Sequence, residues 1–97
     1  MSTLPITERA FAQQVVDLAH LHGWMVYRTW LSVRSPAGYP DLTLCRGERL
    51  LFAELKSDTG TLTPEQRAWL TALDGVPGVE TYAWRPRNLD DAARVLA

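Results

Sequence analysis

Three ionisable residues near the middle of the sequence are spaced so that they could share one chemical site. Asp41 follows a loop-like segment with two prolines and a glycine, and Glu54 and Lys56 are separated by one residue near the end of an apolar run. Alternation along an extended strand puts Glu54 and Lys56 on the same face. Two carboxylates beside a backbone carbonyl form the hard-oxygen ligand set that Mg²⁺ and Mn²⁺ prefer. The pattern therefore predicts a divalent-cation site with a lysine beside it.

An ordinary surface ion pair is the alternative explanation for these charges. A cross-strand pair of Asp41 or Glu54 with Lys56 contributes at most about 1 kcal/mol and occurs on many sheets. Two observations favour a chemical role. Lys56 is the only lysine, and with five glutamates in the chain the chance that one stands two positions before it is about one in twenty. Glu54 also interrupts an apolar strand, where an unpaired carboxylate is costly.

The elements that must position these residues follow from hydrophobic periodicity and turn residues. Strands over 41–46 and 48–56, joined at Gly47, form a hairpin, which places the start of the first strand beside the end of the second. Asp41 is therefore expected close to Glu54. The order αβββαβα predicts a single α/β domain with a central mixed sheet flanked by helices. The other expected elements are a helix from the cap Thr7 to Gly23, a strand over 24–30, a loop over 31–40, a loop over 57–64, a helix from the cap Thr63 to Asp74, a strand over 79–84 and a last helix capped by Asn88.

The order and spacing of three short motifs resemble a known nuclease family. The similarity is to the PD-(D/E)xK nuclease superfamily and, within it, to the virus-type replication-repair nuclease (VRR-Nuc) domain. It runs over nearly the whole chain, and the motifs are more specific together than singly. They are Gly38-Tyr39-Pro40-Asp41, Glu54-Leu55-Lys56, and Gln66 within a Thr-Pro-Glu-Gln helix start.

The resemblance implies a restriction-endonuclease-like domain over residues 1–97 and a role for each residue of the central motifs. Asp41 and Glu54 would bind Mg²⁺ or Mn²⁺ together with the backbone carbonyl of Leu55. Lys56 would position the attacking water or offset developing charge. These implied roles agree with the chemistry expected from the residue types themselves.

Glu8 and Gln66 are implied as accessory catalytic residues, with Glu8 reaching the metal ion through a water molecule. Glu8 heads the inward apolar stripe that continues at Phe11, which is unusual for a solvated charge. A first-turn acid favoured by the helix dipole is the equally weighted alternative. Gln66 completes a capping box with Thr63, yet it shares the face of Trp69, so its amide could also point toward the sheet.

These observations lead us to predict a divalent-metal-dependent DNA endonuclease that hydrolyses phosphodiester bonds. The resemblance implies a minimal nuclease of viral or phage type, a homodimer that acts on branched DNA such as a Holliday junction. Two alternatives stay open: a non-catalytic nucleic-acid-binding or assembly module with the same fold, and a restriction-type or nicking endonuclease. The residues expected to contact DNA are Arg28, Arg34, Ser35 and Tyr39.

Composition sets the limits of this hypothesis. The 97 residues carry 10 basic and 11 acidic side chains, a formal net charge of -1, so DNA contact must come from local clustering of basic side chains.

A single cysteine, Cys45, points to a reducing compartment and is expected to be a small buried residue. Without a signal-peptide pattern or an apolar run of the ~18 residues that span a membrane, we expect a cytoplasmic protein, in the host cytoplasm if viral, with no membrane partner. The four tryptophans are expected to be core or interface anchors rather than base-stacking platforms.

Overall fold

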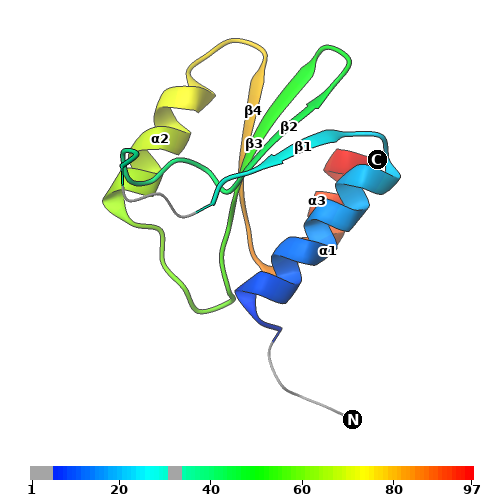
Figure 1. Ribbon diagram of the computed structural model, residues 1–97, viewed down its shortest axis with the longest axis horizontal. Coiled ribbons are helices and arrows are strands. Elements are labelled where there is room, and N and C mark those ends of the chain that lie inside the picture. The colour runs from blue at the N-terminus through cyan, green and yellow to red at the C-terminus, as the bar shows by residue number, and fades with distance from the viewer. Residues whose placement is uncertain (1–5, 31–33) are drawn as a thin grey trace.

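Three helices and four strands make up the described part of the protein, which comprises residues 6–30 and 34–97 of a computed structural model (Figure 1). The order is αβββαβα, so the predicted α/β fold is confirmed. No helix within these two ranges is both long enough and apolar enough to cross a membrane. The elements are α1 (Glu8–Leu21), β1 (Met25–Arg28), β2 (Leu42–Arg46), β3 (Arg49–Leu55), α2 (Pro64–Asp74), β4 (Val79–Trp84) and α3 (Leu89–Leu96), with a 3₁₀ turn at Pro86–Asn88 before α3.

The four strands form one mixed sheet in the order β1-β2-β3-β4. The first two pairings are antiparallel, whereas β4 runs parallel to β3 and is reached through α2. In the β2–β3 hairpin, Leu42 pairs with Ala53. The next position on each strand is Asp41 and Glu54, so this register places the two acids next to each other, as the hairpin predicted.

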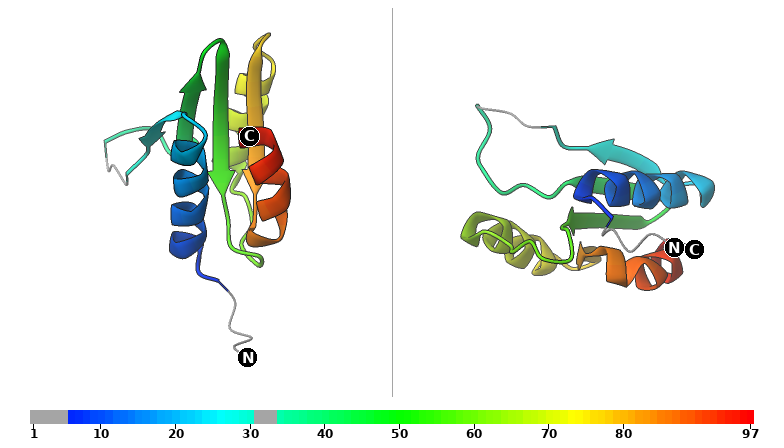
Figure 2. Two further views of the ribbon diagram at one scale, coloured as in Figure 1. Left: turned by 90° about the vertical axis from the view of Figure 1, so that its right-hand side faces the viewer. Right: turned by 90° about the horizontal axis from the view of Figure 1, so that it is seen from below.

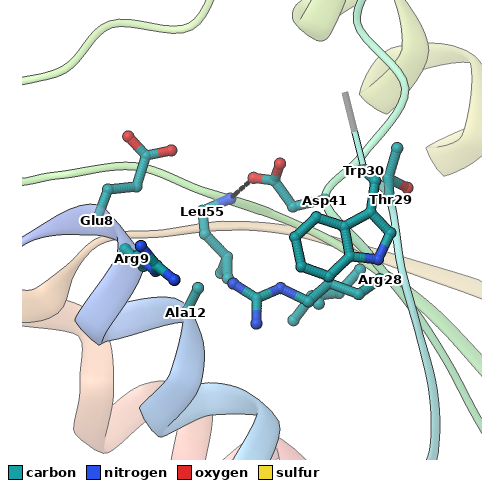
Figure 3. Close-up of a pocket in the computed structure, with 9 residues that line it drawn as sticks. Glu8, Arg9, Ala12, Arg28, Thr29, Trp30, Asp41 and Leu55 are labelled. Atoms are coloured by element: carbon teal, nitrogen blue, oxygen red, sulfur yellow. Dashed lines mark hydrogen bonds between the residues drawn. The ribbon is translucent and has the colours of Figure 1, made fainter. Parts of the chain in front are cut away.

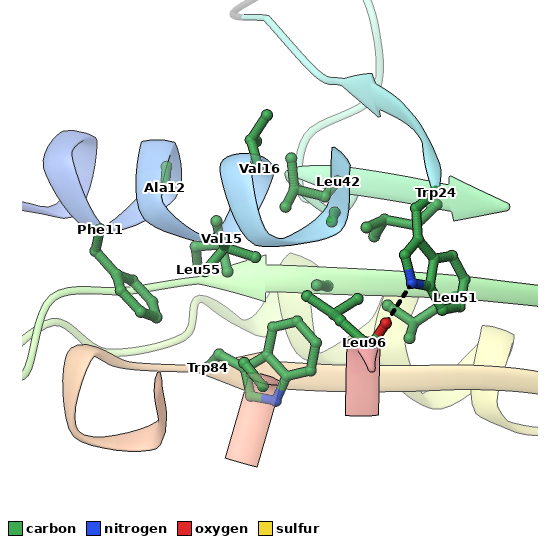
Figure 4. Packing of buried hydrophobic residues seen from close by; sticks show 14 residues of the cluster. Phe11, Ala12, Val15, Val16, Trp24, Leu42, Leu51, Leu55, Trp84 and Leu96 are labelled. Carbon is green, nitrogen blue, oxygen red and sulfur yellow. Dashed lines mark hydrogen bonds between the residues drawn. The ribbon is translucent and has the colours of Figure 1, made fainter. Parts of the chain in front are cut away.

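The two faces of the sheet carry different helices. Helices α1 and α3 lie side by side on one face, and α2 lies on the other (Figures 1 and 2). Alternation along β3 sends Leu51, Ala53 and Leu55 into the core under α1 and α3, while Phe52 and Glu54 face α2. The core residues are Phe11, Ala12, Val15, Val16, Ala19, Trp24, Leu42, Leu44, Leu51, Ala53, Leu55, Trp84, Ala92 and Leu96 (Figure 4).

All three predicted residues stand at helix N-caps, and two of them form a side-chain cap hydrogen bond. The Thr7 side chain caps α1, and Thr63 caps α2 through a capping box with Gln66. Asn88 stands at the predicted N-cap position of α3, but its side chain forms no cap hydrogen bond. Its Oδ1 accepts the backbone N–H of Arg85 at 2.9 Å instead, which closes the 3₁₀ turn that leads into α3.

The end of α3 is fixed by side chains from the first half of the chain. The Nε1–H of Trp24 donates to the carbonyl of Leu96 at 2.8 Å (Figure 4). Arg46 donates to the same carbonyl at 3.0 Å, and Arg49 donates to the carbonyl of Val95 at 3.1 Å. Both guanidinium groups also lie over the Trp24 ring. These contacts satisfy carbonyls that a helix end leaves without partners.

Strands β1 and β2 each depart from one expectation. Cys45 is exposed, so its prediction as a buried residue is wrong: Leu42 and Leu44 face the core, and alternation turns Cys45 to the opposite face. The strand predicted over 24–30 is also shorter, at Met25–Arg28. Trp24 precedes it and is buried, whereas Trp30 follows it and is 76% exposed.

Candidate active site

Asp41 is held at the start of β2 by both its backbone and its side chain. Its carbonyl accepts the backbone N–H of Thr29 at 2.8 Å, and the Thr29 hydroxyl donates to the carbonyl of Pro40 at 2.8 Å. Its Oδ2 accepts the backbone N–H of Leu55 at 2.8 Å (Figure 3). The Asp41 carboxylate is therefore tied to the end of β3, where the Glu54-Leu55-Lys56 motif lies.

Gly38 fixes the loop before Asp41 against the first turn of α2. Its φ of +96° lies in the region that favours glycine, and a Cβ at this position would come within 2.5 Å of the Glu65 carbonyl carbon and 2.8 Å of the Gln66 nitrogen. No side chain fits between two backbones at such distances. Gly38 therefore positions Asp41 relative to Gln66, a role that the sequence pattern alone did not reveal.

Glu54 is the buried acid of the site. It is 2% exposed, and its Oε1 accepts a hydrogen bond of 3.2 Å from Nε2 of Gln66. Its Oε2 is buried and receives no hydrogen bond from a donor within residues 6–30 and 34–97; only a protonated Glu54 can bond the Asp41 carboxylate beside it. A buried carboxylate oxygen without a partner is costly and needs a proton or a cation. The position beside Asp41 is where such a cation would be held.

The environment of Glu54 disfavours its charged form. Burial is the main cause, and together with the Asp41 carboxyl it raises the pKa of Glu54 from 4.5 to about 9. Asp41 acts both by accepting a hydrogen bond from protonated Glu54 and by repelling its ionised form; Glu8 adds a weaker repulsion, while Lys56 partly offsets these effects. Ionisation of the buried Glu54 carboxyl therefore needs a counter-charge, which a cation beside Asp41 could supply.

Lys56 follows β3 and is half-buried. Its backbone N–H donates to the Trp84 carbonyl at 3.0 Å, which anchors the main chain. Its charge acts on Glu54, yet its ammonium group forms no ion pair with a carboxylate within the described residues. The surface ion pair considered as an alternative explanation for Asp41, Glu54 and Lys56 is therefore not formed there.

Gln66 performs both of the functions that its sequence position suggested. Its Oε1 accepts the backbone N–H of Thr63 at 2.9 Å, and its own N–H donates to the Thr63 hydroxyl at 3.1 Å, which completes the capping box. Its Nε2 donates to Glu54. Because one end of the amide serves the helix and the other the site, α2 and the carboxylate are coupled through a single side chain.

Glu8 lines the same pocket as Asp41 and Leu55, although it belongs to the first turn of α1 and is exposed. In Figure 3 the Glu8 and Asp41 carboxylates lie on either side of the Leu55 backbone. Within the described residues, no group of three or more His, Cys, Asp or Glu side chains surrounds a common point. The role of Glu8 as an accessory residue that reaches a metal ion through water therefore stays a prediction.

No family model matches the chain, and no curated protein matches it by sequence. The resemblance to the VRR-Nuc domain thus rests on the motif residues, and the geometry of the site stands on its own.

The four residues expected to contact DNA have different surroundings. Arg28 lines the pocket, and Arg34 and Ser35 are exposed on the loop that leads to Asp41. The ring of Tyr39 meets Phe52 and Trp69 edge to face, with centroid distances of 6.0 and 5.1 Å. Tyr39 therefore packs this loop against β3 and α2, and only its outer part can meet a ligand.

Sequence reasoning missed three residues that shape the pocket. Thr29 holds the Pro40-Asp41 segment, and Arg9 and Trp30 line the pocket walls. Arg9 directly follows Glu8 and Trp30 lies two residues after Arg28, so proximity to candidate site residues was the available signal.

Proposed function

We propose that this protein is a divalent-metal-dependent DNA endonuclease that hydrolyses phosphodiester bonds. The observation that carries the proposal is the buried Glu54 carboxyl: one oxygen accepts a hydrogen bond from Gln66, and the other lies beside Asp41 with no donor to it within the described residues. A purely structural acid would have its oxygens satisfied by the fold. A carboxylate oxygen without a donor and a second acid beside it can bind a cation, and a neighbouring lysine can contact an anionic substrate.

The donor set fits Mg²⁺ or Mn²⁺. These ions take oxygen ligands and are commonly held by one or two carboxylates, with water and substrate phosphate completing the shell. Asp41 and Glu54 would supply the carboxylates, and the Leu55 carbonyl at the same strand end is the third candidate ligand. When bound, such an ion stabilises charge on the scissile phosphate and lowers the pKa of water.

Each residue of the candidate site then has a defined role in the proposed reaction. Asp41 and Glu54 hold the cation, and Gln66 fixes the orientation of Glu54 by donating to one of its oxygens. Lys56 supplies a positive charge beside the reacting phosphate or the attacking water, where preorganised charge acts most strongly. Glu8, across Leu55, would orient water through its carboxylate.

The proposal extends to substrate, assembly and compartment. Branched DNA, such as a four-way junction, is the proposed substrate, and a homodimer would set two sites at a fixed spacing for paired cuts. Leu21 and Met25, which are 75% and 77% exposed, provide apolar surface that such a dimer could bury. The free Cys45 thiol is compatible with a reducing compartment such as the cytoplasm. Light scattering at micromolar concentration tests the dimer, and a strictly monomeric protein that cuts both strands symmetrically would contradict it.

A cleavage assay tests the activity. Linear, flap and four-way-junction DNA are incubated with the protein in Mg²⁺, Mn²⁺ or EDTA, together with the variants Asp41→Asn and Glu54→Gln. Cleavage that needs the metal and is lost in both variants is expected. Asp90→Asn, which changes an exposed acid on α3, is the control and should cleave normally.

Calorimetric titration with Mn²⁺ tests the cation site separately from catalysis. Wild type should bind and Asp41→Asn should bind at least tenfold more weakly, because a hard carboxylate ligand is lost. Equal binding by both proteins would show that the site is assigned to the wrong residues. DNA binding without cleavage in either metal would favour the non-catalytic module.

A further inference from the structure

Two hollows adjoin on the side of the candidate site where Glu8 and Asp41 lie, and neither is lined by Glu54, Lys56 or Gln66. One is lined by Glu8, Asp41 and Leu55, and the other extends along α1 past Thr7 and Gln13. They adjoin because Arg9, Arg28 and Trp30 line both. We call the second hollow and these shared residues the side groove.

Trp30 is exposed to an extent that is unusual for a tryptophan. Trp24 and Trp84 are 3% and 4% exposed, whereas Trp30 is 76% exposed. The Arg28 guanidinium lies over its ring at 5.5 Å from the centroid (Figure 3). One cation thus sits against the indole, and most of the ring surface is still open to a ligand.

The positively charged side chains of the side groove are also available to a ligand. The guanidinium groups of Arg9 and Arg28 form no ion pair and no hydrogen bond within residues 6–30 and 34–97, and the Arg28 group contacts only the Trp30 ring among the aromatic residues. Two guanidinium groups beside an exposed indole match an anion joined to a flat ring. By contrast, the arginines that bind carbonyls or carboxylates of the fold are Arg46, Arg49, Arg85, Arg87 and Arg94.

We propose that the side groove binds an unpaired nucleotide next to the scissile phosphate. Its base stacks on Trp30, and its phosphate contacts Arg9 and Arg28. Bases inside a duplex are already stacked on both faces, so only an unpaired or displaced base can use such a ring. This inference rests on the proposed nuclease function and names its substrate class: DNA with an unpaired nucleotide at the cleavage point, in preference to a continuous duplex.

Cleavage kinetics test the preference. A flap or junction with an unpaired nucleotide at the cleavage point is compared with a fully paired duplex of the same sequence, using Trp30→Ala, Trp30→Phe and Tyr27→Ala. Tyr27 is the matched control because it is a nearby aromatic residue of β1, 67% exposed, that lines neither hollow. Trp30→Ala should lose about tenfold or more in kcat/KM on the unpaired substrate, as expected for one stacked base, and little on the duplex. Trp30→Phe should restore most of the loss, and Tyr27→Ala should behave as wild type.

Binding measured without catalysis separates this inference from the nuclease proposal. Fluorescence anisotropy of a labelled oligothymidylate in EDTA should show weaker binding by Trp30→Ala and by Arg28→Ala, and unchanged binding by Tyr27→Ala. If wild type cuts DNA but Trp30→Ala and Tyr27→Ala match it on both substrates, the proposed nucleotide site in the side groove is wrong, whereas the proposed nuclease activity is supported. If no metal supports cleavage but Trp30→Ala alone among the aromatic variants loses binding, the nucleotide site in the side groove is supported and the proposed nuclease activity is contradicted. Thermal melts confirm that each variant is folded.

Discussion

The side-chain amide of Gln66 donates a hydrogen bond of 3.2 Å to Oε1 of Glu54, while its oxygen accepts the backbone N–H of Thr63 at 2.9 Å. The amide is therefore fixed at both ends, and its orientation leaves no choice of donor and acceptor. Glu54 receives a neutral donor on one oxygen only. Its second oxygen, to which no group within the described residues donates, is left for a proton shared with Asp41 or for the cation that the proposal assigns to the site.

This relationship predicts an informative change at Gln66. Gln66→Glu keeps an acceptor for the capping box but replaces the donor to Glu54 with a second acid. Cleavage should fall at least tenfold, while the melting temperature in the presence of Mg²⁺ changes little compared with the cap-deleting Thr63→Ala. Normal cleavage by Gln66→Glu would show that Gln66 serves only the helix.

A second prediction concerns Lys56. The Lys56 ammonium forms no ion pair within the described residues, so its charge is available to the reaction. Lys56→Ala should therefore lower the cleavage rate by a factor of about 10² or more, comparable with the loss of one preorganised electrostatic stabiliser. The fold should persist, since the anchoring contact to Trp84 is made by the backbone N–H.

Single-turnover cleavage and a urea melt check the Lys56 prediction together. Arg67→Ala is the charge-matched control, because it removes one exposed cation from α2. A folded Lys56→Ala protein with undiminished cleavage would move the reaction to another site or favour the non-catalytic module.

Local signals allowed much of the fold to be predicted. The alternation along 50–56, the hairpin turn at Gly47 and the capping box at Thr63 depend on neighbouring residues, and each is present. The approach of Asp41 to Glu54 followed from hairpin register alone.

The features that sequence reasoning missed depend on tertiary contacts. The Asn88 side chain turns back to Arg85 rather than forward into α3, a choice between two local hydrogen bonds that the residue type does not decide. Whether Cys45 is buried depends on which part of the sheet a helix covers. The close approach of Gly38 to α2 joins segments far apart in the sequence, and a glycine in a proline-rich loop signals only a turn.

A third prediction compares two glycines with positive φ. Gly47 has a φ of +59°, and a Cβ added there would meet nothing within 4 Å, whereas Gly38 combines a φ of +96° with a 2.5 Å approach to backbone. Gly47→Ala should cost about 1 kcal/mol of unfolding free energy through backbone strain alone. Gly38→Ala should cost at least about 2 kcal/mol and should also weaken Mn²⁺ binding, because the loop that carries Asp41 must move. Equal losses in urea denaturation would contradict the proposed positioning role of Gly38.

The last prediction concerns pH in the absence of metal. Because burial raises the pKa of Glu54 to about 9 against 4.5 ordinarily, the unfolded chain loses this proton near pH 4.5 while the folded protein retains it. Between these values the folded state binds more protons, so the stabilisation is complete below pH 4.5 and is lost as pH rises toward 9, by at most about 1.4 kcal/mol per pH unit. Glu80 has the opposite shift, since Arg49 lowers its pKa, and its effect is complete above pH 4.5.

Urea melts in EDTA between about pH 5.5 and 8.5 therefore isolate Glu54. Wild type should lose stability with rising pH relative to Glu54→Gln, which carries no titrating proton at this position. Addition of Mn²⁺ should reverse the loss at high pH in wild type and have no such effect in Glu54→Gln, because the ion replaces the proton on the buried carboxylate. Parallel pH profiles of the free energy of unfolding for the two proteins in EDTA would show that Glu54 is ionised in the folded protein without a cation. That result would contradict the main observation on which the proposed metal site rests.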